Sequence, residues 1–128
     1  MHHLLYLRDK EKYGNHQEWV MHMGGRAVKC YAIRSKCTNA WCGYVEVGDR
    51  KLDTDELDVH GGITRGSDTS IGFDCSHAGD WMPGPDLPVE TPPEVIRAMQ
   101  NLRNSEDHYW TFHEVKAETE RLANQIFG

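Results

Sequence analysis

The sequence predicts an α+β fold: a mainly antiparallel four-stranded sheet with two helices packed on one face. Two observations predict this class. Four strand-like runs lie between residues 26 and 75, and two segments with helix start signals follow near residues 92–103 and 112–127. Strands grouped before helices, instead of alternating with them, are typical of α+β folds. The length of 128 residues fits a single domain, residues 1–128.

The first two predicted strands form a hairpin. Residues 26–34, RAVKCYAIR, place alternate side chains on two faces, and residues 40–48, AWCGYVEVG, follow after a turn at residues 35–39. Two strand-like runs joined by a short polar turn are typical of an antiparallel pair. Gly43 inside the second run indicates a bulge or a close approach of another segment.

Two more strands are predicted at residues 57–64 and 69–75. The residues between them, Arg65 to Asp68, include Gly, Ser and Asp, which favour turns. The chain before the first strand, residues 1–24, shows no clear periodicity. We expect it to be an N-terminal segment without a defined element, anchored by Trp19 and its apolar neighbours.

Both predicted helices have N-terminal capping signals. The helix near residues 92–103 follows Thr91, with proline at its first position and Glu94 at its third. The helix at residues 112–127 follows Thr111, and a glutamate three residues later completes a capping box. Apolar residues in this last helix recur on one side, so we expect that side to pack on the sheet.

Composition excludes several classes of function. The formal net charge is −6, whereas non-specific binding to DNA or RNA requires a basic surface. No run approaches the roughly 18 apolar residues that span a bilayer, and the N-terminus lacks the apolar core of a signal peptide. We therefore expect no membrane partner and a cytoplasmic location. Exposed aromatic side chains would suit a homo-oligomer, although no motif specifies one.

The densest group of chemically capable side chains lies where the third and fourth predicted strands end. His60 is followed by two glycines, and a second cluster occupies residues 74–80, DCSHAGD. Glycine lacks a Cβ and so allows another backbone or a ligand to come close. Histidine, cysteine and aspartate move protons, attack electrophiles or bind metals. The candidate catalytic residues are His60, Asp74, Cys75, His77 and Asp80.

A metal site is one interpretation of this group. His60, Cys75 and His77 would supply three ligands for zinc or another divalent transition metal, with Asp74 or Asp80 as alternatives to the thiol. Such a site would keep a position open for a water molecule and lower its pKa. The spacing matches no standard zinc motif, so no cofactor is specified by the sequence.

A phosphate or nucleotide site is a second interpretation. Backbone N–H groups of a double glycine and the guanidinium of a nearby arginine are suitable donors for phosphate oxygens. The ligand-binding residues in this interpretation are His60, Gly61, Gly62, Arg65, Asp74, His77 and Asp80.

Two further interpretations use the same residues. Cys75 could act as a nucleophile with His60 or His77 as its base, provided that the side chains can reach each other. Alternatively, His60 could simply hydrogen-bond Asp74 or Asp80 and fix the packing of the two hairpins, because buried polar groups normally find such partners.

Three sequence blocks resemble a group of small uncharacterised bacteriophage and prophage proteins. The blocks are Trp41-Cys42-Gly43-Tyr44-Val45, His60-Gly61-Gly62-Ile63-Thr64 and residues 72–80, GFDCSHAGD; a C-terminal helix containing VKAE follows them. The resemblance spans roughly residues 30–126 and does not include residues 1–24 or the proline-rich segment with its helix. It implies no catalytic residues.

The resemblance does imply a biological setting. Small phage proteins of this kind often act on the host cell, by inhibiting a defence complex or by removing a signalling nucleotide. We therefore expect a cytoplasmic accessory protein that binds a host protein or a nucleotide-like ligand, with counter-defence as its role. The alternative is a metal-assisted hydrolase of a phosphoester or nucleotide that uses His60, Asp74, His77 and Asp80.

Overall fold

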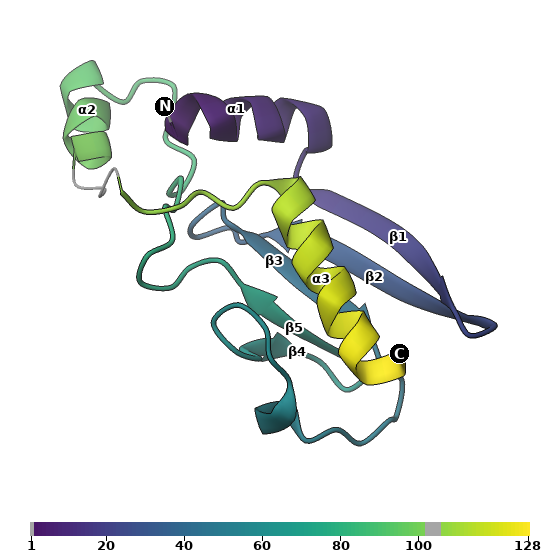
Figure 1. The fold of residues 1–128 in the computed structure, drawn as a ribbon. Coiled ribbons are helices and arrows are strands. Elements are labelled where there is room, and N and C mark those ends of the chain that lie inside the picture. The colour runs from purple at the N-terminus through teal and green to yellow at the C-terminus, as the bar shows by residue number, and fades with distance from the viewer. Residues whose placement is uncertain (1, 102–105) are drawn as a thin grey trace.

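A five-stranded sheet forms one layer of the protein, and the long C-terminal helix packs on it (Figure 1). The computed structural model describes residues 2–101 and 106–128. Neighbouring strands are antiparallel throughout, in the order β1-β2-β3-β5-β4, which confirms the α+β class. The elements in chain order are α1 (His2–Tyr13), β1 (His16–Met23), β2 (Arg26–Arg34), β3 (Trp41–Glu46), the 3₁₀-helix η1 (Thr54–Glu56), β4 (Arg65–Gly66), β5 (Ser70–Asp74), α2 (Pro93–Asn101) and α3 (Phe112–Phe127).

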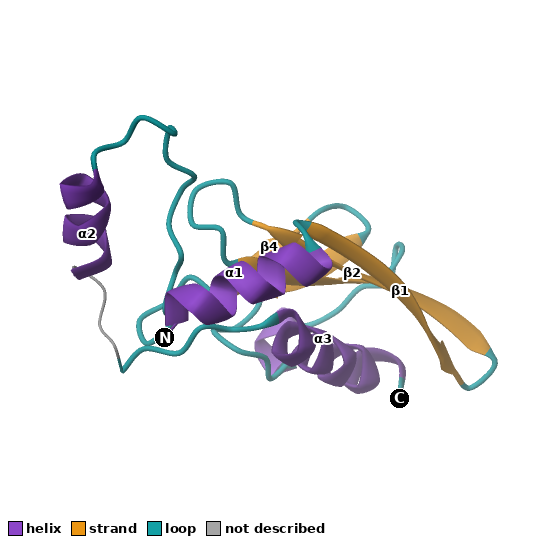
Figure 2. Ribbon diagram, turned by 90° about the horizontal axis from the view of Figure 1, so that it is seen from above, coloured by secondary structure: helices purple, strands orange, loops and turns teal. Residues whose placement is uncertain are grey.

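Alternate side chains of the central strands point toward α3 and form the core. Gly43 of β3 lies beneath this helix, where a Cβ would come within 2.3 Å of Thr119 Oγ1, so the close approach predicted at Gly43 is present. In the part of the chain that the structure describes, no α-helix covers the opposite face (Figure 2). The core side chains include Val28, Cys30, Ala32, Trp41, Val45 and Phe73 from the sheet, and Val115, Leu122 and Ala123 from α3.

The strand predicted at residues 57–64 is not formed. The N–H group of Asp58 donates to Gln125 Oε1 at 2.8 Å, and that of His60 donates to Glu118 Oε2 at 2.7 Å. Both acceptors are side chains of α3, so they satisfy donors that a neighbouring strand would otherwise satisfy. The segment is therefore a loop tied to the helix. The strand that pairs with the free side of β5 is the two-residue β4, which lies in the stretch predicted as a turn.

The N-terminal segment, residues 1–24, has more structure than the sequence predicted. It forms α1 and the edge strand β1, so the sheet has five strands instead of four. Exposure alternates along β1, with Trp19 and Met21 packed against the core and Glu18 and His22 exposed. The polar Gln17 on the inner face and the apolar Val20 on the exposed face concealed this period of two.

The helix predicted near residues 92–103 is formed as α2, but it does not pack on the sheet (Figure 2). Residues 102–103 of that prediction lie outside the described residues. Ile96 and Met99 of α2 instead line a cavity of about 310 Å³ with Tyr6 and Leu7 of α1. The apolar face of α2 indicated that this helix packs on another segment, but it did not indicate which one. The prediction that the helix packs on the sheet was therefore wrong. No helix among the described residues has the length and apolar content needed to cross a membrane.

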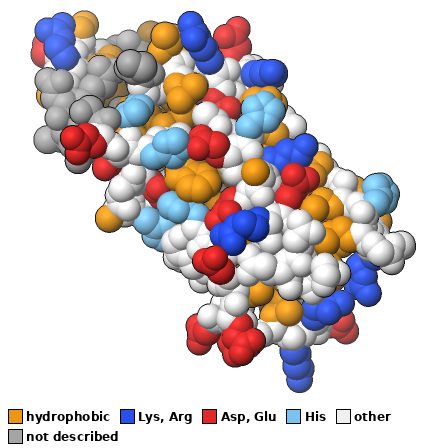
Figure 3. Space-filling model, in the orientation of Figure 1, with side chains coloured by type: hydrophobic (Ala, Val, Ile, Leu, Met, Phe, Trp, Pro, Cys, Tyr) orange, Lys and Arg blue, Asp and Glu red, His pale blue; other side chains and the backbone are white. Residues whose placement is uncertain are grey.

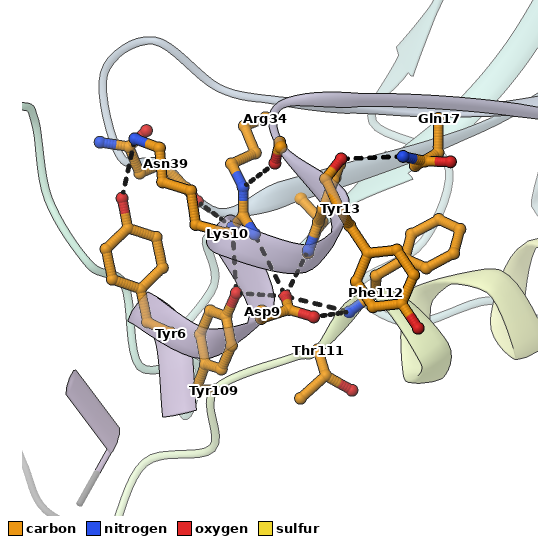
Figure 4. A network of polar contacts seen from close by, with 12 residues as sticks. Tyr6, Asp9, Lys10, Tyr13, Gln17, Arg34, Asn39, Tyr109, Thr111 and Phe112 are labelled. Carbon is orange, nitrogen blue, oxygen red and sulfur yellow. Dashed lines mark hydrogen bonds and ion pairs between the residues drawn. The ribbon is translucent and has the colours of Figure 1, made fainter. Parts of the chain in front are cut away.

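A buried ion pair joins α1 to the sheet and to the start of α3 (Figure 4). Arg34 Nη2 lies 3.1 Å from Asp9 Oδ2, and the two side chains are 1% and 5% exposed. The Asp9 carboxylate also accepts hydrogen bonds from Trp41 Nε1, the Tyr109 hydroxyl and the Phe112 N–H. Because each polar group in this network has its partners, we assign the network a structural role.

Candidate functional site

The loop that follows β5 is held in place by the segment before α3. The Trp81 N–H donates to the carbonyl of His108 at 2.7 Å, and the His108 N–H donates to that of Gly79 at 2.9 Å. Asp80 and His108 form an isolated parallel bridge between these hydrogen bonds. The side chains after β5 therefore have a fixed position beside the start of α3.

The first pair of the site joins His60 to Asp80. Nε2 of His60 lies 2.9 Å from each carboxylate oxygen of Asp80, whose side chain is only 3% exposed. The same carboxylate accepts a hydrogen bond from the His77 N–H at 3.0 Å. The His60 ring is one quarter exposed, so a buried carboxylate orients a histidine that solvent can still reach.

The second pair joins His77 to Asp74, three residues earlier in the chain. Nε2 of His77 lies 2.8 Å from Asp74 Oδ1, but the ring is not aligned for a hydrogen bond to this oxygen. This buried nitrogen has no hydrogen-bond partner among the described residues. A buried polar atom without a partner is uncommon in native proteins and often marks a functional group.

Asp74 also has polar contacts with residues other than His77. The Thr64 hydroxyl donates to Oδ2 at 2.9 Å, the Ser76 N–H donates to Oδ1 at 3.1 Å, and Arg65 Nε lies 3.3 Å from Oδ2. Burial raises the pKa of Asp74, but the two hydrogen bonds and the charges of His77 and Arg65 together hold it below its usual range. Asp74 is therefore an anion at neutral pH.

The rings of His60 and His77 form a T-shaped pair. Their centroids lie 5.9 Å apart with an interplanar angle of 78°. Gly61 makes this arrangement possible, because a Cβ at this position would lie 2.3 Å from His77 Nε2. The φ angle of +69° at Gly61 also favours glycine. The close approach expected at this glycine is thus to a side chain of the site.

Two rings beyond the predicted residues extend the site. Trp110 packs against His60 with centroids 4.2 Å apart, and His108 lies 5.8 Å from Trp110. We call His77, His60, Trp110 and His108 the ring row. Figure 3 shows histidine, hydrophobic and acidic side chains gathered on the face that carries α3. The sequence signal that could have identified these two rings is the position of His108 and Trp110 directly before the capped helix α3.

Two carboxylates of α3 contact the ring row. Glu118 accepts the His60 N–H at 2.7 Å and is itself paired with Arg121. Arg121 lowers the pKa of Glu118, burial opposes this effect, and the His60 N–H adds to the lowering. Glu114, the capping-box residue of α3, pairs with His108. Every histidine of the row therefore has a carboxylate within contact distance.

The phosphate donors predicted from the sequence are only partly available. The Gly62 N–H donates to the Val59 carbonyl at 2.9 Å and so closes a turn. Arg65 lies at the rim, where its side chain is 45% exposed and its Nε contacts Asp74. The site thus offers a half-exposed guanidinium to a ligand, whereas the Gly62 amide is already engaged.

Cys75 lies in the core instead of the site. It is 2% exposed among the apolar side chains beneath α3, and burial, reinforced by nearby anionic groups such as Asp80, raises the pKa of its thiol. A protonated, buried thiol favours a packing role over a nucleophilic one. Within the described ranges, no three His, Cys, Asp or Glu side chains converge as metal ligands, so the residues do not fit the proposed zinc site.

Comparisons with protein-family models, with curated proteins and with solved structures find no match to this chain. Two half-buried histidines, each beside its own carboxylate, can orient a ligand and can exchange protons with it. Arg65 at the rim can bind an anionic group.

Proposed function

We propose that this protein binds a small, phosphate-bearing, nucleotide-like ligand at His60, His77 and Arg65. The observation that supports this proposal most directly is the facing pair of histidine rings, 5.9 Å apart, each beside its own carboxylate. Nε2 of His60 is engaged by Asp80 and Nε2 of His77 lies beside Asp74, so a ligand would meet the exposed parts of the two rings. Imidazole, guanidinium and ammonium groups are the side-chain donors that bind phosphate oxygens.

The acidic partners do not prevent anion binding at this place. Asp80 already interacts with the His60 ring and with the His77 N–H. Asp74 already receives Thr64, Ser76 and Arg65, so its negative charge is compensated locally. The carboxylates act as supports that orient the donors, and the exposed parts of the two rings and of Arg65 remain to contact the ligand.

The biological role we propose is counter-defence in the host of a bacteriophage, and it comes from the resemblance to phage proteins. Sequestering a nucleotide-like signal would require only binding. Within the same setting, the rival proposal is inhibition of a host defence protein through the acidic side chains around η1. These side chains are Asp53, Asp55, Glu56 and Asp58.

A phosphoester or nucleotide hydrolase is the second candidate. The specific observation in its favour is again the facing histidines, since one could take a proton while the other gives one. The metal-assisted form of this proposal has no donor set within the described ranges, so the histidines themselves would carry the proton transfers.

Native mass spectrometry with a pool of linear and cyclic nucleotides tests these proposals. The protein alone should show its own mass, and a bound nucleotide mass should appear with the pool. His60→Gln, His77→Gln and Arg65→Gln should each weaken this binding about tenfold or more, by loss of one charge-assisted contact. The matched control is His22→Gln on β1, which is exposed and remote from the site.

The outcomes separate the candidates. Product masses that disappear in His60→Gln would establish the hydrolase. An unliganded protein in every condition would reject both small-ligand proposals and leave a host protein as the target. Binding that survives in all three site variants would place the ligand elsewhere. Thermal unfolding of each variant distinguishes lost binding from lost folding.

A further inference from the structure

One edge of the sheet is formed by β1, whose outer side lies at the outside of the molecule (Figure 1). Among the described residues, β1 pairs with β2 alone, residue by residue and without a bulge. Edge strands in natural proteins are usually short, or they are protected by proline, lysine or a bulge. With eight residues and none of these protecting features, β1 is able to pair with another strand.

The register of the β1–β2 hairpin shows which backbone groups point outward. The Arg34 N–H donates to the Asn15 carbonyl at 2.9 Å, so these two residues form a hydrogen-bonded pair directly before the pair of His16 with Ile33. Hydrogen-bonded and non-hydrogen-bonded pairs alternate along an antiparallel ladder. Every second residue of β1 therefore directs its N–H and C=O groups away from β2. These residues are His16, Glu18, Val20 and His22.

The side chains of the same four residues lie on the sheet face that α3 does not cover, and all four are exposed. Val20 is 52% exposed, with Glu18 two residues before it and His22 two residues after it. Glu18 has ion pairs with His16 and Lys29 of its own chain, but half of its side chain stays exposed. Exposed pairs of this kind contribute little, so they leave the carboxylate available to a further partner.

We infer that two copies of this chain pair antiparallel along β1, with Val20 opposite the partner's Val20. In this register Glu18 lies opposite the partner's His22, and Trp19 lies opposite the partner's Met21. An imidazole can donate a hydrogen bond to the facing carboxylate, and apolar pairs and opposite-charge pairs both stabilise antiparallel strands. Because the two copies are related by a two-fold axis at Val20, each off-axis contact occurs twice.

The two neighbouring registers with the same hydrogen-bonding residues are less suitable. One places Glu18 opposite the partner's Glu18, and like charges in this position are destabilising. The other places Glu18 opposite the partner's Val20, which leaves the carboxylate without a polar partner across the axis. Charge complementarity therefore favours the register centred on Val20.

The other edge of the sheet does not offer β1 a comparable partner strand. It is formed by β4, which has only two residues, so the pairing of β1 with β1 closes at two copies instead of growing into a fibre. Arg65 of the proposed ligand site belongs to β4 and so lies at this opposite edge. The inference is thus independent of the proposed function, and the dimer would leave that site open.

Sedimentation velocity over a range of protein concentrations tests for the dimer. The parent protein should change from monomer to dimer as its concentration rises. Val20→Lys would place two ammonium groups opposite each other at the axis, so it should weaken the dimer about tenfold or more. Val89→Lys is the matched control and should leave the dimer unchanged, because Val89 is 99% exposed and lies outside the sheet.

Cross-linking with a short thiol-specific reagent tests the register, in a Cys37→Ser background because Cys37 is exposed. Val20→Cys should be cross-linked, since Cα atoms of directly opposite hydrogen-bonded residues lie about 5.5 Å apart. His22→Cys should not, because its two copies would be about 14 Å apart along the strands. A parent protein that stays monomeric up to millimolar concentration would overturn the inference. So would a dimer that Val20→Lys leaves unchanged with normal thermal unfolding, or cross-linking of His22→Cys without that of Val20→Cys.

Discussion

At the scale of single residues, Asp74 shows how the fold selects a protonation state. Its hydrogen bonds with Thr64 and Ser76 exist only in the folded chain, and they favour the carboxylate form. Its pKa is consequently lower in the folded protein than the ordinary value of 3.8. A group of this kind stabilises the fold above its unfolded pKa, and this contribution disappears as the pH falls through the folded pKa.

The first prediction concerns this acid dependence. We expect the free energy of unfolding to fall between about pH 5 and pH 2, and Asp74→Asn to show a shallower fall, because the amide does not titrate. Urea unfolding followed by circular dichroism across this range measures both slopes. Asp68→Asn is a suitable control, since Asp68 is exposed in the turn before β5. A parallel acid profile for Asp74→Asn and the parent protein would contradict the prediction.

The second prediction uses two adjacent glycines. Gly61 and Gly62 have φ angles of +69° and +80°, but only a Cβ at Gly61 would meet the His77 ring. Alanine at either position should cost about 1–2 kcal/mol for the left-handed backbone. Gly61→Ala should cost more and should also shift the His77 ring signals in NMR spectra, while Gly62→Ala should leave those signals in place. Identical spectra for both variants would show that Gly61 does not position His77.

At the scale of elements, the start of α3 depends on a capping box. Thr111 Oγ1 accepts the Glu114 N–H, and the Glu114 carboxylate accepts the Thr111 N–H. Thr111→Ala should lower the free energy of unfolding by about 1 kcal/mol, whereas Thr111→Ser should keep most of it. Chemical denaturation of the three proteins measures the difference. Because Glu114 also contacts His108, Thr111→Ala should disturb the ring row as well.

The capping box also shows which elements the sequence could predict. It located the start of the last helix, and alternation located the strand at residues 26–34, because both signals are local in the chain. The strand predicted at residues 57–64 failed because its backbone partners are the side chains of Glu118 and Gln125. Residues this distant in sequence leave no trace in a local pattern.

The candidate site, too, could be predicted from the sequence only where the signals are local. Spacing and residue type identified four side chains that the structure brings into two pairs: His60, Asp74, His77 and Asp80. The sequence offered Asp74 or Asp80 as the partner of His60 but could not choose Asp80, because that pairing depends on the hydrogen bonds between the loop after β5 and the segment around His108. Trp110 was missed for the same reason, since its contact with His60 joins distant segments.

At the scale of the whole molecule, the Asp9 network joins three parts of the chain. Asp9→Ala would leave the buried guanidinium of Arg34 without its anion, so we expect a loss of about 3–5 kcal/mol in the free energy of unfolding. Asp86→Ala is the control, because the pair of Asp86 with Lys10 is exposed and should contribute less than about 1 kcal/mol. Thermal unfolding compares the two. Similar losses would mean that the network is less coupled than its contacts indicate.

The helices should also differ in local stability. The side chains described in α2 are mostly exposed, and α3 is packed on the sheet. Amide hydrogens near Arg97 in α2 should therefore exchange far faster than those near Leu122 in α3. Hydrogen exchange followed by mass spectrometry measures the protection of both segments. Equal protection would show that the cavity between α1 and α2 is a tight contact under native conditions.

The Asp9 network has a consequence for synthesis on the ribosome. Asp9 is made before two of its partners, Tyr109 and Phe112, which follow it by 100 and 103 residues. A nascent chain cannot complete this network until both partners have left the exit tunnel. The β1–β2 hairpin, whose pairing is local, can form much sooner. During translation the Arg34 guanidinium would therefore stay solvated, and it would be buried only when α3 packs on the sheet.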